Sequence, residues 1–213
     1  MIHFMMHAEL DGLICSGGRR GKQFTYALLD ERTPQTKSLT HEEALTELTS
    51  RYFTSHGPAT LQDFVWWSGL TATDVRKALE LIKSKLDSET VNGQTFLFAE
   101  EAPPRRKDKS PSINLLPDYD EYLVGYADRS AIFDTAHTDK LDSRGSVLAQ
   151  HVILSAGQII ASWRRTLQKK SVAIESKLFI TLKQAEKKAI IQAAERYANF
   201  LNLPFSIDFQ ETD

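Results

Sequence analysis

The stretch from residue 40 to residue 98 constrains the fold most, because capping residues separate its helical patterns and a turn signal follows them. Thr40 and Glu43 have the spacing of a capping box, in which the threonine accepts a backbone N–H and the glutamate reaches back to the cap. Apolar residues then recur at helical spacing until Gly57 and Pro58, a pair that ends helices. The sequence therefore predicts a helix between these two signals.

Two further helices are predicted before residue 90. Thr60 is a second N-cap and begins a short helix that contains Trp66 and Trp67. Residues 68–70 form a tight glycine turn, and Thr71 caps a third helix whose apolar residues share one face. Because a short amphipathic helix buries its aromatic face, we expect the two tryptophans to pack in the core rather than stack on bases.

A hairpin follows the third helix. Asn92 and Gly93 tolerate the positive φ angles of a type I′ turn, and residues 89–91 and 94–98 on either side have strand character. Three helices and a hairpin, with a glycine turn between the second and third helices, form the layout of a winged helix-turn-helix. We assign this domain to residues 36–100.

The first 35 residues resemble the end of another such unit. Ile2, Met5, Met6 and Leu10 have helical spacing, a glycine-rich loop follows, and residues 22–29 read as a strand. A helix and a wing without the two preceding helices suggest a truncated winged helix, so we expect the chain to start within a domain.

The chain changes character after residue 100. Residues 101–112 contain three prolines within a charge run and are predicted to be a linker. Residues 113–213 read as a small β-rich domain with one long helix, at 185–201, so the predicted class is α+β. Its strands are expected at residues 113–116, 122–126, 151–155, 158–165, 172–175 and 205–209.

Composition excludes several classes of protein. No apolar run approaches the ~20 residues that span a bilayer, and the first four residues lack the features of a secretory signal. Cys15 is the only cysteine, which rules out an internal disulfide and a multi-cysteine metal site. We therefore expect a cytoplasmic protein that binds no membrane, no metal and no cofactor.

The net charge does not favour a polyanionic partner, so any binding to DNA must depend on local clusters of basic residues. The net charge is −2, from 26 Lys and Arg against 28 Asp and Glu, but phosphate contacts depend on the charge of one face. A basic cluster this short is more often only a solvated surface, so these clusters count only if the fold places them together. We take as candidate DNA-binding residues those on the first glycine loop, the third helix and the later strands: Arg19, Arg20, Lys22, Thr71, Thr73, Arg76, Lys77, Arg164, Arg165 and Lys169.

Two details qualify these candidates. Arg164 and Arg165 are adjacent in a predicted strand, so alternation places them on opposite faces and only one can serve a shared surface. Asp118, Asp120 and Glu121 lie close together but have no spacing that sets an acid and a base across a substrate. We interpret these carboxylates as a polar loop and predict no catalytic residue.

Four groups of residues share a pattern with a known family: residues 8–17, residues 52–60 with 63–70, residues 115–126 with 128–129, and residues 161–165. They resemble the bacterial winged-helix DNA glycosylases of the AlkZ/YcaQ type. The resemblance implies tandem winged helices followed by a β-barrel-like domain, which together form a channel for double-stranded DNA, and an activity that excises bulky or crosslinked alkylated bases.

The sequence departs from that family at its catalytic motif. The resemblance implies Gln–apolar–Gln or Gln–apolar–Asp near the N-terminus, and neither Gln-x-Gln nor Gln-x-Asp occurs in these 213 residues. We therefore expect a DNA-binding portion that is catalytically incomplete, completed by a preceding region or an oligomer partner. Whether the chain is an enzyme stays open, and so do two alternatives: a non-catalytic winged-helix regulator and a winged-helix module that binds protein.

Overall fold

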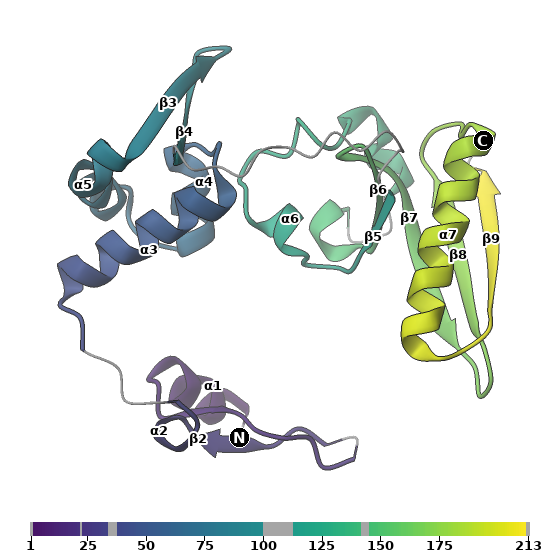
Figure 1. The fold of residues 1–213 in the computed structure, drawn as a ribbon, viewed down its shortest axis with the longest axis horizontal. Coiled ribbons are helices and arrows are strands. Elements are labelled where there is room, and N and C mark those ends of the chain that lie inside the picture. The colour runs from purple at the N-terminus through teal and green to yellow at the C-terminus, as the bar shows by residue number, and fades with distance from the viewer. Residues whose placement is uncertain (1, 22, 34–37, 100–112, 142–144, 212–213) are drawn as a thin grey trace. The chain divides into compact units, whose positions relative to one another are not determined.

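The computed structural model of the protein describes residues 2–21, 23–33, 38–99, 113–141 and 145–211. The chain divides into two compact units, residues 1–44 and residues 45–213 (Figure 1). The predicted linker at 101–112 and the candidate residue Lys22 lie outside the described residues. Helices and mixed strands make this an α+β protein, as predicted.

The first unit contains a helix, a two-stranded antiparallel hairpin and one further helical turn. Its elements are α1 (Ile2–Leu10), β1 (Ile14–Ser16), β2 (Tyr26–Leu28) and α2 (Leu29–Arg32). No described side chain of this unit is buried, and Phe4 and Leu10 are 80% and 81% exposed. The described part of residues 1–44 therefore encloses no core of its own.

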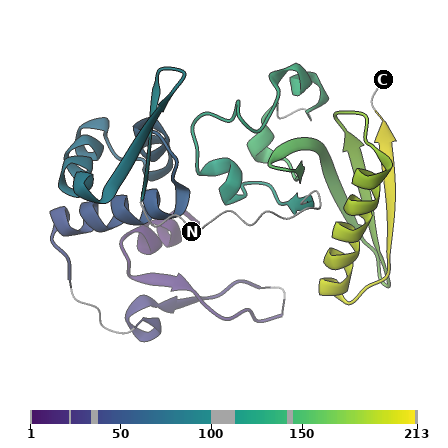
Figure 2. The same ribbon diagram turned by 45° about the horizontal axis from the view of Figure 1, so that its top comes forward.

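Three helices and a hairpin follow, in the predicted order. They are α3 (His41–His56), α4 (Leu61–Ser68), α5 (Ala72–Ile82), the 3₁₀ turn η1 (Lys83–Lys85), β3 (Leu86–Val91) and β4 (Gln94–Ala99). The hairpin turns at Asn92 and Gly93, whose φ angles are 51° and 79°, as a type I′ turn requires. In both ribbon views the hairpin projects away from the helices (Figures 1 and 2).

Capping residues set where these helices begin and end. At the start of α3 the backbone N–H of Thr40 donates to Glu43 Oε2 at 2.8 Å, and Glu43 N donates to Thr40 Oγ1 at 3.2 Å. At α4, Thr60 Oγ1 accepts from the backbone N–H of Asp63 at 3.1 Å. Gly69 closes α4 with a φ of 69°, a conformation that costs glycine little. All of these signals were predicted from the sequence.

The three helices enclose a small aromatic core. Tyr52, Phe53 and Phe64 are at most 1% exposed and pack with Ala59 and Val75. The rings of Tyr52 and Phe53 meet edge to face with their centroids 5.1 Å apart, a favoured aromatic geometry. These aromatic rings fill the centre of the three-helix core and thereby fix the positions of α4 and α5 against α3.

The remaining residues form a five-stranded sheet and the helices around it. The elements are β5 (Ile113–Leu116), α6 (Glu121–Val124), η2 (Thr135–Lys140), η3 (Val147–Ala149), β6 (Val152–Ser155), β7 (Gln158–Leu167), β8 (Val172–Leu178), α7 (Gln184–Leu201) and β9 (Phe205–Glu211). The strand order is β5-β6-β7-β8-β9, antiparallel except that β9 runs parallel to β8. Helix α7 makes the crossover between those two strands (Figure 1).

The two faces of this sheet have different roles. Ile153, Trp163, Val172 and Ile174 pack against α7 on one face. On the other face, the β6 end is covered by a second cluster that includes Leu123, Phe133 and Phe179. The β7–β9 end of that face carries polar side chains, because alternation turns Arg164, Glu175 and Lys177 away from α7.

Two predictions for this half are wrong. Residues 122–126, predicted as a strand, lie largely in the helical turn α6, which Asp120 begins by accepting from the backbone N–H of Tyr122 at 2.9 Å. The barrel-like arrangement is not formed either: within the described residues the sheet is open, with β5 and β9 as its edges. A parallel strand placed after α7 extends an edge instead of closing the sheet.

Candidate nucleic-acid interface

Helix α5 presents the polar face that the sequence predicted. Its buried residues are Val75, Ala78 and Ile82, so the exposed face carries the four candidates Thr71, Thr73, Arg76 and Lys77. The hydroxyl of Thr71 is already used, because it caps the helix and bonds to Asp74 Oδ2 at 2.7 Å. The side chains available on one face are therefore those of Thr73, Arg76 and Lys77. The exposed carboxylate of Glu80 lies on the same face, 3.6 Å from Lys83 Nζ, and would oppose a phosphate.

Trp66 corrects one expectation for α4. Its side chain is 50% exposed instead of buried, its Nε1 donates to the carbonyl of Val124 at 3.0 Å, and the guanidinium of Arg129 lies 5.2 Å from its ring centroid. Trp67 does pack in the core, with its ring 5.0 Å from that of Tyr52. Helix α4 thus has two occupied faces, one toward α3 and one toward the segment after α6.

The glycine loop of the first unit exposes its arginines. Arg19 lies over the ring of Phe24 with its Cζ 4.7 Å from the centroid. The main chains of Arg20 and Gln23 exchange two hydrogen bonds, of 3.2 and 3.1 Å. Both arginine side chains are exposed, so they are accessible to a partner and bury little surface.

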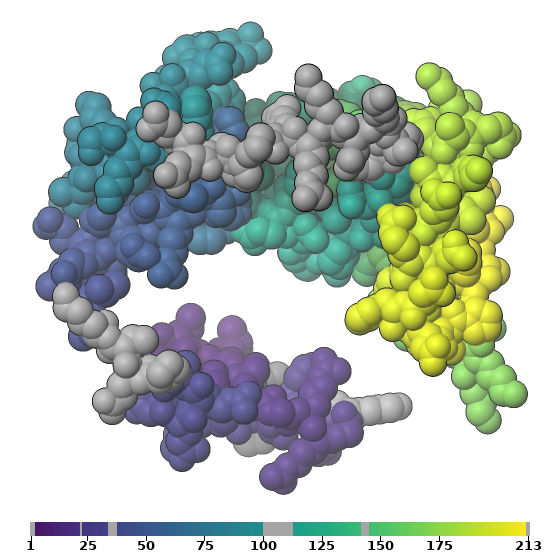
Figure 3. Space-filling model, viewed as in Figure 1, coloured from purple at the N-terminus to yellow at the C-terminus, as the bar shows by residue number. Residues whose placement is uncertain are grey.

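Arg164 and Arg165 lie on opposite faces of β7, as predicted. Arg165 Nη1 donates to the hydroxyl of Tyr197 on α7, and its Cζ lies 5.4 Å from that ring centroid. Arg164 lines a cavity on the other face. Lys169 is exposed in the turn between β7 and β8, which projects beyond the end of α7 in the space-filling view (green, Figure 3).

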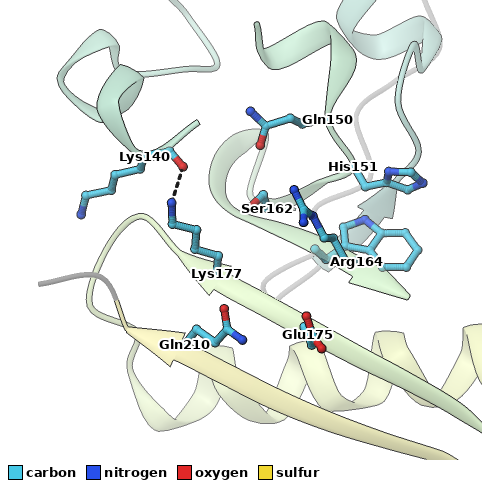
Figure 4. Close-up of a pocket in the computed structure, with 9 residues that line it drawn as sticks. Lys140, Gln150, His151, Ser162, Arg164, Glu175, Lys177 and Gln210 are labelled. Atoms are coloured by element: carbon cyan, nitrogen blue, oxygen red, sulfur yellow. Dashed lines mark hydrogen bonds between the residues drawn. The ribbon is translucent and has the colours of Figure 1, made fainter. Parts of the chain in front are cut away.

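The cavity at Arg164 has a volume of about 410 Å³ and a largely polar lining. Side chains from β7, β8 and β9 meet residues that precede β6 around it (Figure 4). The lining comprises Lys140, Gln150, His151, Ser162, Trp163, Arg164, Glu175, Lys177 and Gln210. The sequence indicated only Arg164, because the others come from separate segments that the sheet brings together.

A hydrogen-bonded cluster that the sequence analysis missed joins the helices to the segment after β5. His56 Nε2 lies 2.9 Å from Glu121 Oε1, and the Nε1 of Trp67 donates to the same oxygen at 2.6 Å. The hydroxyl of Tyr126 donates to the carbonyl of His56 at 2.9 Å. The only sequence signal was that these residues fall in the segments that resemble the glycosylase family.

Two buried tyrosines in this cluster have raised pKa values. Burial is the main cause for Tyr52 and for Tyr126, and the nearby Asp63 carboxylate raises both pKa values further. The hydroxyl of Tyr52 donates to the carbonyl of Gly125 at 2.7 Å. Both phenols are therefore held as neutral hydrogen-bond donors.

The acidic residues of the 118–121 loop contact three different parts of the structure. Asp120 caps α6, Asp118 Oδ1 lies 3.9 Å from His151 Nε2, and Glu121 bonds to His56 and Trp67. Each carboxylate therefore has its own structural partner.

Two histidines of α1 have a spacing suited to a metal. His3 and His7 lie one turn apart on this helix, a spacing that can chelate a metal ion. No group of three or more metal-binding side chains occurs among the described residues. Over the same residues, no helix has the length and apolarity needed to cross a membrane.

Comparisons with known proteins agree with this α+β architecture. The family model "DNA glycosylase AlkZ-like" matches residues 2–200. An interstrand DNA cross-link repair glycosylase of Streptomyces sahachiroi is 24% identical over 159 residues, which cover 71% of this chain and 43% of that protein. The solved structure of the S. sahachiroi DNA glycosylase AlkZ has a TM-score of 0.72 at 21% identity, over 92% of this chain and 55% of that one.

The fold is that of an α+β protein with the architecture of a solved DNA glycosylase. Because the family model covers nearly the whole chain, the protein belongs to the AlkZ-like DNA glycosylase family. The chain spans less than two thirds of the length of either relative it matches.

Proposed function

We propose that this chain is the duplex-DNA-binding portion of an AlkZ-like protein that acts on alkylated bases. In this proposal residues 36–100 are a winged helix-turn-helix, residues 1–35 the last helix and wing of another, residues 101–112 a linker and residues 113–213 a C-terminal domain. The family membership supports repair of DNA as the context.

The observation that carries the proposal is the exposed face of α5. The helix follows the Gly69 turn, is anchored by buried Val75, Ala78 and Ile82, and leaves Arg76 and Lys77 exposed. A helix held in this way fits the major groove, where such side chains reach phosphates and base edges. The projecting β3–β4 hairpin would be the wing of this domain.

Other contacts would come from sites with exposed cations. Arg19 and Arg20 form the tip of the first wing in this proposal, Lys22 stays a predicted contact, and Arg164 and Lys169 contribute from the C-terminal domain. Arg165 is proposed as a weaker contributor, because its guanidinium already bonds to Tyr197. A few dispersed cations favour weak binding that does not depend on DNA sequence.

Fluorescence anisotropy with a labelled duplex tests the proposal. With roughly three to five phosphates neutralised, the logarithm of affinity should fall against the logarithm of salt concentration with a slope of about −3 to −5. The variant Lys77→Gln should bind more weakly and reduce the slope by about one.

A charge-matched control locates the effect. Lys188→Gln removes an exposed lysine from α7, so it changes net charge equally and should leave both affinity and slope unchanged. Equal effects of the two variants, or no duplex binding at low salt, would contradict the proposal and favour a module that binds protein.

A further inference from the structure

We infer that the cavity on the open face of the sheet is a binding site for a phosphate group. Its lining includes two permanently cationic side chains, those of Arg164 and Lys177, against the single carboxylate of Glu175. An excess of positive charge around a cavity of about 410 Å³ attracts an anion and excludes a cation.

One lysine is held at the cavity by the backbone. Lys177 Nζ donates to the carbonyl of Lys140 at 2.9 Å (dashed line, Figure 4), whereas the side chain of Lys140 points away and donates to the carbonyl of Phe179 at 2.8 Å. An ammonium has three donors, so Lys177 keeps two for a ligand. Over the described residues the Lys177 ammonium pairs with no carboxylate. The site is therefore organised before any ligand arrives.

Gln150 supplies an independent observation. Its side chain lines the cavity and is 4% exposed, yet its Nε2 has no hydrogen-bond partner among the described residues. An unpaired buried donor is costly and rare. A ligand oxygen would satisfy it, and a phosphate has only acceptor oxygens, disposed in several directions, that match donors arriving from strands and loops alike.

Two sources of phosphate share this chemistry: the backbone of a nucleic acid and free phosphate. The nucleic-acid source rests on the proposed function, whereas binding of free phosphate does not. The cavity belongs to a different part of the chain from α5, so it can bind phosphate whether or not α5 binds DNA.

Titration of the isotope-labelled protein with inorganic phosphate, at constant ionic strength, tests the site directly by NMR. The side-chain amide signals of Gln150 should shift and saturate. Lys177→Gln should weaken phosphate binding about tenfold, because a charge-assisted hydrogen bond is lost. Lys188→Gln, on the far side of the sheet, should bind phosphate as the unmodified protein does.

A second variant separates binding from folding. Gln150→Leu removes the unpaired donor at similar volume, so phosphate affinity should fall while the melting temperature stays equal or rises. A linear, non-saturating response to phosphate, or equal binding in Lys177→Gln and Lys188→Gln, would overturn the inference. So would a Gln150→Leu protein that folds and binds phosphate undiminished.

Duplex DNA added to the phosphate-loaded protein identifies the source. Release of phosphate as the duplex binds supports a backbone phosphate in the cavity, and simultaneous binding of both supports free phosphate. Saturable phosphate binding in a protein that binds no duplex supports the cavity site and contradicts the proposed function, so the two failures are distinguishable.

Discussion

Asp63 is 5% exposed, yet both of its carboxylate oxygens have partners. Oδ2 accepts from the backbone N–H and the hydroxyl of Thr60, each at 2.8 Å, and Oδ1 accepts from the backbone N–H of Ala127 at 2.8 Å. Burying the carboxylate is tolerable because its lone pairs are used. The cap at Thr60 was predictable from the sequence, whereas a partner 64 residues away was not.

Tyr52 provides a test of this cluster. Tyr52→Phe keeps the ring that packs on Phe53 and Phe64 but leaves the buried carbonyl of Gly125 without its donor. We expect a loss of about 1–2 kcal/mol in the free energy of unfolding, measured by urea denaturation. Tyr119→Phe is the control: its side chain is 64% exposed, so its effect should stay within about 0.5 kcal/mol.

The raised pKa of Tyr52 also predicts a pH dependence. Burial raises the pKa in the folded protein above the unfolded value of about 10. The folded protein holds the proton more tightly, so this contribution to stability is complete below pH ~10 and is lost as pH rises toward the folded pKa. Tyr52→Phe should therefore lose less stability above pH ~10 than the unmodified protein. An identical alkaline loss in both proteins would contradict the assignment.

At the scale of elements, α6 shows why the local sequence pattern predicted a strand where the structure has a helical turn. Tyr122, Val124 and Tyr126 favour strands by composition, and a helix of four residues is too short to display a helical period. Gly125, which ends the turn, packs closely against α3: a Cβ on it would lie 2.8 Å from Cδ2 of the His56 ring. That constraint comes from a distant helix, so no local window contains it.

Elements bounded by capping residues or turn residues were predicted correctly, whereas the tertiary contacts of their side chains were not. The caps at Thr40, Thr60 and Thr71 and the turn at Asn92 are local chemistry, and the structure confirms each. The expectation for Trp66 was wrong because its partners, Val124 and Arg129, lie in and after α6. The polar face of α5 followed from helical periodicity, whereas the lining of the cavity at Arg164 depends on strand order and register.

The hairpin loop of the first unit carries a prediction of its own. Arg19→Ala combined with Arg20→Ala should weaken duplex binding without lowering the melting temperature, because both side chains are exposed and bury little surface. Affinity by anisotropy and melting temperature by circular dichroism should be measured on the same samples. A large drop in melting temperature would show that the arginines are structural, and unchanged affinity would remove this loop from the proposed interface.

At the scale of the molecule, the chain has the architecture of a solved glycosylase structure but spans only part of the length of that protein. The likeness to the solved S. sahachiroi structure covers 92% of this chain but 55% of that one. Residues that resemble the family meet in the cluster around His56, Asp63 and Glu121, which holds the helices against the segment after β5. Within this chain, these residues therefore make structural contacts between the helices and the segment after β5.

The last prediction is that this chain alone does not excise alkylated bases. A glycosylase must stabilise the sugar cation and position water, and the glutamine motif that the family resemblance implies for this task is absent from the 213 residues. Losing a positioned catalytic group typically costs ~10²–10⁴ in rate. Incubation with duplex containing N7-alkylated guanine, followed by alkaline cleavage and a gel, should give no more product than the duplex without protein. Multiple turnovers would contradict the prediction, and Asp118 and Asp120 would then be the first residues to replace.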